Sequence, residues 1–113
     1  MKTEDIARIC HEANAAYCLS LGDTSQTDWD NAPDWQKKSA INGVKFHMEV
    51  PNGRTPEESH GNWLKEKLAA GWKYGKIKDP NKKEHPCCVP YDKLPEEHKV
   101  KDRIFTAIVK ACR

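Results

Sequence analysis

The sequence is short of apolar residues and has no long hydrophobic run. Hydrophobic residues make up 37% of its 113 positions, while charged residues make up 32%. No apolar run approaches the ~20 residues that a transmembrane helix needs, which argues against a membrane protein. The N-terminal segment MKTEDIARIC also lacks the apolar core of a signal peptide. We therefore expect a cytoplasmic protein that forms one domain over residues 1–113.

The sequence also lacks an excess of charge of one sign. It has 19 Lys and Arg residues against 17 Asp and Glu residues, for a formal net charge of +2. Domains that bind nucleic acid usually carry a clear basic excess on one face. We therefore expect neither a nucleic acid nor a membrane as the partner.

The cysteines have neither the number nor the spacing of a disulfide framework or a metal site. There are five of them, and an odd number without a signal peptide indicates reduced thiols. The segment His85–Cys88 suggests metal binding, but Cys87 and Cys88 are adjacent, whereas zinc sites use separated ligands such as C-x-x-C. Cys10 and His11 are neighbours on a predicted helix, so their side chains point to different faces. We assign no catalytic residue, metal ligand or cofactor, and do not expect an enzyme.

Apolar residues recur at helical spacing in four segments, which are residues 4–21, 33–50, 56–70 and 95–112. The third segment has the clearest signal. Thr55 can cap it, Pro56 suits the first helical position and Glu58 completes a capping box. Thr3 is the expected cap of the first helix.

The second segment is ambiguous between a helix and a β-hairpin. Asn42-Gly43 is a strong hairpin signal, and the residues from Val44 to Val50 alternate as a strand would. Trp35, Val44 and Met48 also fit one helical face, and the preceding WQKKSAI has no strand alternation. The pattern favours a helix without excluding the hairpin.

Residues 72–93 show no helical pattern, and two short strands are expected there, one at Trp72–Tyr74 and one within Cys88–Tyr91. The predicted fold is therefore α+β and mainly α, with about four helices and a small two-stranded β element in residues 72–91. Ten apolar side chains form the expected core: Ile6, Ile9, Tyr17, Trp35, Val44, Trp63, Leu64, Leu68, Ile104 and Ile108.

Residues of rare types recur with a definite spacing in the second half of the chain. They are His60-Gly61-Asn62-Trp63, Gly71-Trp72, Tyr74-Gly75, Asp79, Lys82-Lys83, His85-Pro86-Cys87 and Leu94-Pro95. This pattern resembles the RyR domain, the repeat first named from ryanodine-receptor channels, most strongly over residues 55–112. Residues 6–50 resemble the front half of stand-alone, single-repeat microbial and phage versions, in which residues 33–50 correspond to a helix.

The resemblance also implies a type of site. In the channels, the repeats occur as tandem pairs, and one pair offers a crevice lined by tryptophans of the G-W-x-Y-G segments, where an adenine nucleotide can stack. Trp72 is the matching residue here. Because this chain carries one copy, a crevice built from two repeats would require a homodimer.

The residues themselves suggest how a planar, phosphorylated ligand would be held. Trp72 and Tyr74 offer ring faces for stacking, and four nearby lysines, Lys73, Lys76, Lys78 and Lys82, offer positive charge for a phosphate. His60, Trp63 and His85 complete the expected ligand site.

The alternative for Trp72 is a purely structural role, in which its ring fixes the loop against the third helix. At the level of function, we expect a non-enzymatic binding module for a nucleotide or a similar small ligand. The alternative is a protein-interaction or assembly module without a small ligand.

Overall fold

The computed structural model describes residues 1–113 as four α-helices with a very small sheet. The helices are α1 (Thr3–Ser20), α2 (Asp34–Met48), α3 (Pro56–Ala69) and α4 (Glu96–Cys112). The strands are β1 (Lys73–Tyr74) and β2 (Glu84–His85), and 3₁₀ turns cover η1 (Trp29–Asn31) and η2 (Tyr91–Lys93). The predicted mainly helical α+β fold is confirmed. None of the helices has the length and apolar character that a membrane span requires.

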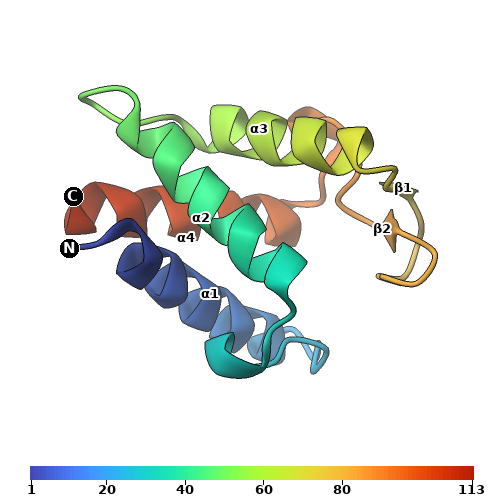
Figure 1. The fold of residues 1–113 in the computed structure, drawn as a ribbon. Helices are drawn as coiled ribbons and strands as arrows, with labels where there is room; N and C mark the ends of the chain where they lie inside the picture. Colours follow the sequence, from blue (N-terminus) through green and yellow to red (C-terminus); the bar gives the residue numbers. More distant parts are fainter.

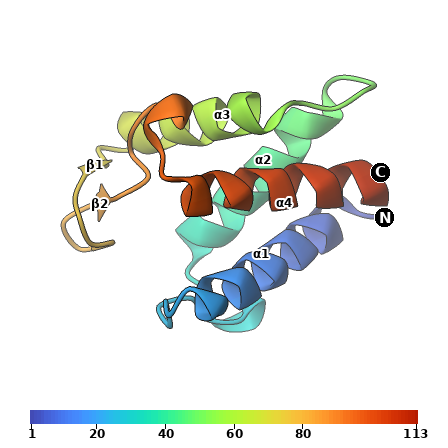
Figure 2. The same cartoon turned by 180° about the vertical axis from the view of Figure 1, so that it is seen from behind.

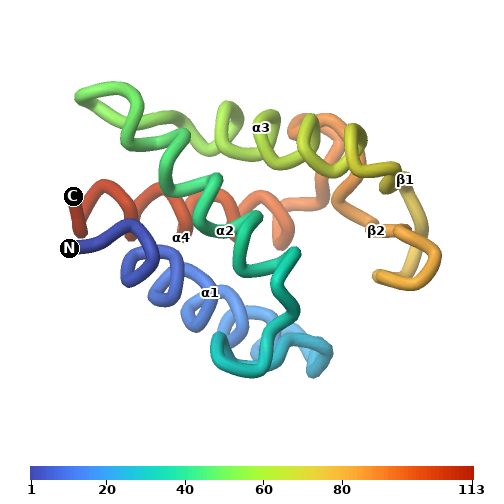
Figure 3. Tube along the Cα trace, in the orientation of Figure 1, coloured from blue at the N-terminus to red at the C-terminus, as the bar shows by residue number.

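The four helices form a compact bundle with the sheet at one end (Figures 1 and 2). α1 and α4 run antiparallel, and the Tyr17 hydroxyl at the end of α1 donates a hydrogen bond of 2.7 Å to the Glu97 carbonyl at the start of α4. α2 crosses one side of this pair, and α3 lies beside α4 (Figure 2). Figure 3 shows the chain leaving α3, passing through the β lobe (residues 72–91) and returning to α4.

The hydrophobic core lies between α1, α2 and α4. Its fully buried members are Ile6, Ala7, Cys10, Trp29, Val44 and Val109. Trp29 therefore closes the core from the loop that follows α1, and its backbone N–H donates to Glu12 Oε1 at 2.7 Å. Three predicted core residues, Ile9, Trp35 and Leu68, are exposed. In α1 the buried stripe is centred on Ala7, and Ile9 lies about 200° around the helix from it.

Local sequence explains the start of α3 and not the start of α1. Glu58 N–H donates to Thr55 Oγ1 at 3.1 Å and Thr55 N–H donates to Glu58 Oε1 at 3.0 Å, so the predicted capping box is confirmed. The predicted cap at Thr3 is wrong, because α1 already begins at Thr3 and its N-cap position is Lys2.

α2 is a continuous helix through Asn42 and Gly43, so the hairpin interpretation of this segment is wrong. The glycine has a packing role instead. A Cβ atom at Gly43 would lie 2.9 Å from Phe105 Cζ of α4, a distance too short for a carbon–carbon contact. Close packing of α2 on α4 thus explains a residue that otherwise suggests a turn.

The second strand is not where the sequence predicts it. β2 is Glu84–His85, and it pairs in parallel with β1 in the register Lys73 with Glu84 and Tyr74 with His85. The chain reverses early because Asp79 Oδ1 accepts hydrogen bonds from the backbone N–H groups of the two residues that follow Pro80. The expected strand at Cys88–Tyr91 is instead a turn that leads into η2.

Candidate ligand cavity

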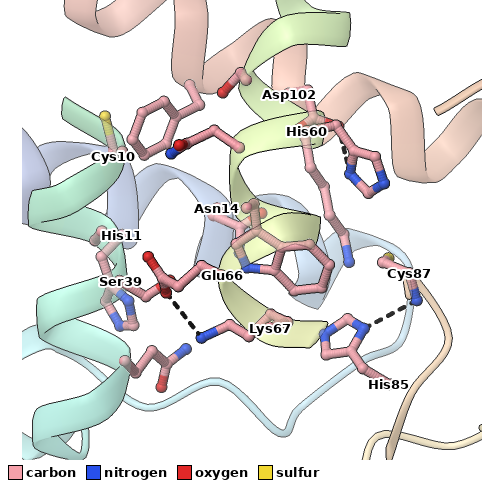
Figure 4. A pocket seen from close by; sticks show the side chains of 18 of the residues that line it. Cys10, His11, Asn14, Ser39, His60, Glu66, Lys67, His85, Cys87 and Asp102 are labelled. Atoms are coloured by element: carbon pink, nitrogen blue, oxygen red, sulfur yellow. Dashed lines mark hydrogen bonds and ion pairs between the residues drawn. The ribbon is translucent and has the colours of Figure 1, made fainter. Parts of the chain in front are cut away.

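A cavity of about 200 Å³ lies where the four helices meet the β lobe. Figure 4 shows its lining, with side chains from α1 and α2 on one side, α3 in the middle, and α4 and the β lobe on the other. The helical core thus forms its floor, and the segment after α3 closes its side.

Three tryptophans from different parts of the fold line this cavity. They are Trp35 in the first turn of α2, Trp63 in the middle of α3 and Trp72 at the start of the β lobe. The rings of Trp35 and Trp72 are in contact, with centroids 5.2 Å apart at an angle of 50°. Trp72 is only 8% exposed, whereas Trp35 is 36% exposed. Trp35 is therefore the ring that a ligand entering from solvent can reach.

Lys67 is buried among these three rings. Its ammonium Nζ lies 5.0 Å from the Trp35 ring centroid, 5.7 Å from that of Trp72 and 6.0 Å from that of Trp63. Its side chain is 7% exposed, and the one carboxylate it pairs with is Glu66, at 3.3 Å. Cation–π attraction to three indole faces thus helps to offset the cost of burying the charge.

Two further lysines line the cavity, Lys78 from the β lobe and Lys101 from α4. Both are partly buried, and neither forms a salt bridge. Burial lowers the pKa of the Lys78 ammonium, and Lys101 and Lys67 lower it further, while Asp23 opposes them. The three cavity lysines therefore repel one another, and only part of their charge is compensated within the protein.

His85 presents a fixed hydrogen-bond donor. Its Nδ1 accepts a hydrogen bond of 2.9 Å from the backbone N–H of Cys87, so the ring proton sits on Nε2. Burial, followed by the charges of Lys78 and Lys101, lowers the pKa of His85 to about 3, so the ring is neutral near pH 7. This histidine can donate a proton to a hydrogen bond but cannot serve as a base near neutral pH.

His60 and Asp102 face each other on the cavity wall. His60 Nε2 donates to the carbonyl of Val89 at 2.7 Å, which leaves Nδ1 without a proton in the neutral ring and 3.6 Å from Asp102 Oδ2. Burial lowers the pKa of His60 and raises that of Asp102 to about 7. A protonated Asp102 would present its O–H to the free lone pair of His60.

The thiol of Cys87 lies 3.4 Å from His98 Nδ1, a pairing that could suggest a nucleophile and its base. Burial raises the pKa of Cys87 to about 11, however, so the group stays a thiol and is a poor nucleophile. No group of three or more His, Cys, Asp or Glu side chains is placed to hold a metal ion. The Cys87–His98 pair therefore does not provide an activated nucleophile.

Comparison with known families adds a decisive observation. The model of the RyR domain matches residues 40–111 of the 113-residue chain. The chain belongs to the RyR domain family. In this RyR domain the matched residues run from the middle of α2 to the end of α4, so they include Trp63, Lys67 and Trp72. Trp35 and all of α1 lie before the match begins.

Five of the nine ligand-site residues predicted from the sequence of this RyR domain line the cavity: His60, Trp63, Trp72, Lys78 and His85. The other four do not: Lys73, Tyr74, Lys76 and Lys82. Lys73 and Tyr74 are exposed in β1 on the outside of the β lobe, and the Lys73 ammonium lies 3.8 Å from Glu84. Whether any of the nine binds a ligand stays a prediction.

Sequence reasoning missed Trp35, Lys67, Lys101 and Asp102 as cavity residues, whereas Lys78, suggested as a phosphate contact, lines the cavity. Lys67 could have been found from the sequence, because it lies four residues after Trp63 in a predicted helix and must share a face with it. The positions of Lys78 and Lys101 depend on how the β lobe folds back onto α4, which local patterns do not specify.

Proposed function

We propose that this RyR domain is a non-enzymatic binding module, and that its cavity holds a nucleotide or a similar small, planar, phosphorylated ligand. The observation that carries the proposal is the set of three tryptophans around one cavity with a buried ammonium at their centre. Indole faces stack with nucleobases whatever the base, and apolar pockets with a few placed polar groups are the usual form of a ligand site.

The size of the cavity favours a small ligand. Its 200 Å³ lies below the roughly 300–1,000 Å³ of sites for drug-sized molecules. A single ring system can enter between the tryptophans, with the rest of the ligand extending toward the partly buried lysines. Trp35, as the most exposed of the three rings, would form the outer stacking surface.

Binding is a better proposal than catalysis because the cavity lacks a matched set of reactive groups. Asp102 has the one pKa near 7 that suits general acid–base work. It faces neutral His60, and the nearest thiol, Cys87, has a pKa of about 11. A proton acceptor without a nucleophile or a metal site does not indicate a reaction.

Thermal-shift measurement with a panel of nucleosides, nucleotides and sugar phosphates tests the proposal. A ligand at 100 times its Kd should add about 2.7 kcal/mol to the free energy of unfolding, which is readily seen as a rise in Tm. Binding should also quench tryptophan fluorescence, because the rings of Trp35 and Trp72 line the cavity.

The variant Trp35→Ala should lose most of this binding, and Tyr74→Ala is its matched control. Both residues are substantially exposed aromatics, but only Trp35 lines the cavity. The proposal is wrong if no compound raises the Tm, or if the two variants bind equally well. A domain that binds no small molecule and captures a protein partner would support the alternative, an interaction or assembly module.

A further inference from the structure

The three cavity lysines are only partly balanced by acidic groups. Glu66 pairs with Lys67 at 3.3 Å, and Asp102 faces His60 and has a pKa of about 7, so it is only partly ionised near neutral pH. Lys78 and Lys101 form no salt bridge, although burial lowers the pKa of Lys78 and the charge of Asp23 opposes that shift. Two ammonium groups with water partly removed and no carboxylate in salt-bridge contact are costly unless an anion completes the arrangement.

The same region also contains the neutral donor of His85. Its ring proton is fixed on Nε2 by the hydrogen bond from Cys87 N–H to Nδ1. His85, Lys78, Lys101 and Lys67 line the same cavity, and burial together with the charges of the three lysines lowers the pKa of His85. Figure 4 shows His85 beside Cys87 on the β-lobe side of the cavity, and Lys67 on the central helix α3 with its nitrogen directed toward Glu66. The donors around His85 therefore converge from α3, the β lobe and α4.

We infer that Lys78, Lys101 and the Nε2–H of His85 form a subsite for a phosphoryl group, with Lys67 at its inner edge beneath the tryptophans. This inference rests on the proposed function and specifies where the phosphoryl group of the ligand would bind. Several ammonium donors and one neutral N–H suit an anion with several oxygens and a charge near −2, such as a phosphate monoester. A planar ring would then stack on the tryptophans while its phosphate contacts Lys78 and Lys101.

Of the lysines that the sequence suggested as phosphate contacts, only Lys78 belongs to this subsite. Lys73, Lys76 and Lys82 are exposed and lie outside the cavity. Exposed lysines keep most of their water, and their attraction to a phosphate is weak because solvent and salt screen it. Partly buried ammonium groups act through a lower effective dielectric and discriminate more strongly between charged and neutral ligands.

Calorimetric titration with four ribonucleosides, their 5′-monophosphates and inorganic pyrophosphate tests the subsite. Lys78→Gln and Lys101→Gln should each weaken binding of the preferred monophosphate about tenfold or more, which corresponds to ~1.4 kcal/mol. Binding of the matching nucleoside should change little. Lys76→Gln removes the same charge from the exterior of the β lobe and should leave both affinities unchanged. Lys101→Arg keeps the charge and should retain much of the monophosphate binding.

The stability of the unliganded variants separates a binding role from a structural one. Removing one of three mutually repelling ammonium groups should leave the Tm of the free protein unchanged or raise it. A lower Tm for both glutamine variants, with no selective loss for phosphorylated compounds, would assign these lysines a structural role and overturn the inference.

The panel also separates failure of the subsite from failure of the proposed function. Nucleosides that bind as tightly as their monophosphates, with Lys101→Gln equal to Lys76→Gln, would refute the phosphoryl subsite and leave stacking intact. Pyrophosphate binding that depends on Lys101, without any contribution from a nucleoside, would support the subsite and refute the planar-ligand proposal. Absence of binding by every compound would refute both.

Discussion

Asp102 and His60 illustrate how burial sets the protonation of single residues on the cavity wall. The carbonyl of Val89 accepts the Nε2 proton of His60 at 2.7 Å, and the opposite ring nitrogen faces Asp102 Oδ2 at 3.6 Å. Because two acceptors face each other in this arrangement, the pair is most stable when it holds one additional proton. The raised pKa of Asp102, about 7, is consistent with that geometry.

We predict that Asp102→Asn stabilises the protein more at pH 8 than at pH 4.5. The folded protein keeps the Asp102 proton up to about pH 7, whereas the unfolded chain loses it near the ordinary value of 3.8. Wild-type stability from this group is therefore lost as the pH rises from about 4 to 7. Asparagine removes that loss and can donate to His60 Nδ1. The gain at pH 8 should be on the order of 2–4 kcal/mol.

Urea unfolding at the two pH values measures this difference, with Asp92→Asn, an exposed aspartate, as the control. Burial raises the pKa of Asp102, and the charge of Lys101 lowers it. Lys101 is therefore left unchanged in both variants. The depressed pKa values of His60, His85 and His98 affect wild type and variant alike in acid. Equal stability changes at pH 4.5 and pH 8 would contradict the assignment.

Trp72 shows what sequence reasoning could and could not decide about one residue. Its two interpretations are a stacking surface for a ligand, which stays a prediction, and an anchor that fixes the loop against the third helix. Its backbone N–H donates to the Lys67 carbonyl at 2.9 Å, which fixes the start of the β lobe to α3. Its ring lines the cavity beside Trp35. Trp35 itself was predicted as a core residue, because helical spacing gives a face but not what lies opposite it.

At the level of elements, the helices followed from the sequence because their signals are local. Each of the four predicted helices is present, and their ends differ from the predicted ends by one or two residues. β2 could not be predicted in the same way. Glu84–His85 has no alternating pattern, and its pairing with β1 depends on a close approach at Gly75, where a Cβ atom would lie 2.6 Å from Glu84 Cβ.

Two isoleucines allow a matched test of which elements carry the stability. Ile6 of α1 is fully buried in the core, whereas Ile77 of the β lobe is 80% exposed. We predict that Ile6→Ala lowers the free energy of unfolding by about 2–5 kcal/mol, through lost burial and a cavity in the core. Ile77→Ala should change it by less than about 0.5 kcal/mol.

Urea or thermal unfolding followed by circular dichroism compares the two isoleucine variants directly. A cost for Ile77→Ala close to that of Ile6→Ala would mean that the β lobe packs on a surface that the structure does not show. A negligible cost for Ile6→Ala would contradict the position of the core between α1, α2 and α4.

At the level of the whole molecule, the cavity lies between the well-packed helical core and the lightly packed β lobe. The core residues come from α1, α2, α4 and the adjoining Trp29, and none comes from the β lobe. The lobe has two strands of two residues each. It is attached to α3 through Trp72 N–H and through Lys83 Nζ, which donates to the carbonyl of Ala70 at 2.8 Å.

We predict that hydrogen exchange is slowest in α1 and much faster in residues 73–86 of the β lobe. Backbone amides open with free energies that depend on local packing, and the lobe has few buried apolar contacts. A ligand that fills the cavity should slow exchange in the lobe selectively, because Trp72, Lys78 and His85 all line the cavity. Mass spectrometry of peptides with and without ligand measures both effects. Equal protection of α1 and the lobe in the free protein would contradict the prediction.

The structure of the whole molecule also changes one expectation drawn from the RyR resemblance, which concerns the tryptophan-lined crevice. The resemblance to tandem repeats suggested that a tryptophan-lined crevice would need a second copy. One chain already places three tryptophans around one cavity, because α2 supplies Trp35, whose ring contacts Trp72 of the β lobe. The family-model match begins after Trp35, at residue 40, and the resemblance over residues 6–50 includes Trp35 without giving it a role in a site. Whether the protein also forms a homodimer stays a prediction.

Both ends of the chain lie at the same end of the bundle, and the β lobe lies at the other (Figure 1). This polarity follows from the antiparallel course of α1 and α4. A peptide linker added at either terminus would therefore leave from the side remote from the cavity. The domain could be spliced into an exposed loop of a fluorescent or enzymatic reporter, with its cavity facing outward. Such a fusion would turn occupancy of the cavity into an optical signal and allow a large compound collection to be screened for the ligand.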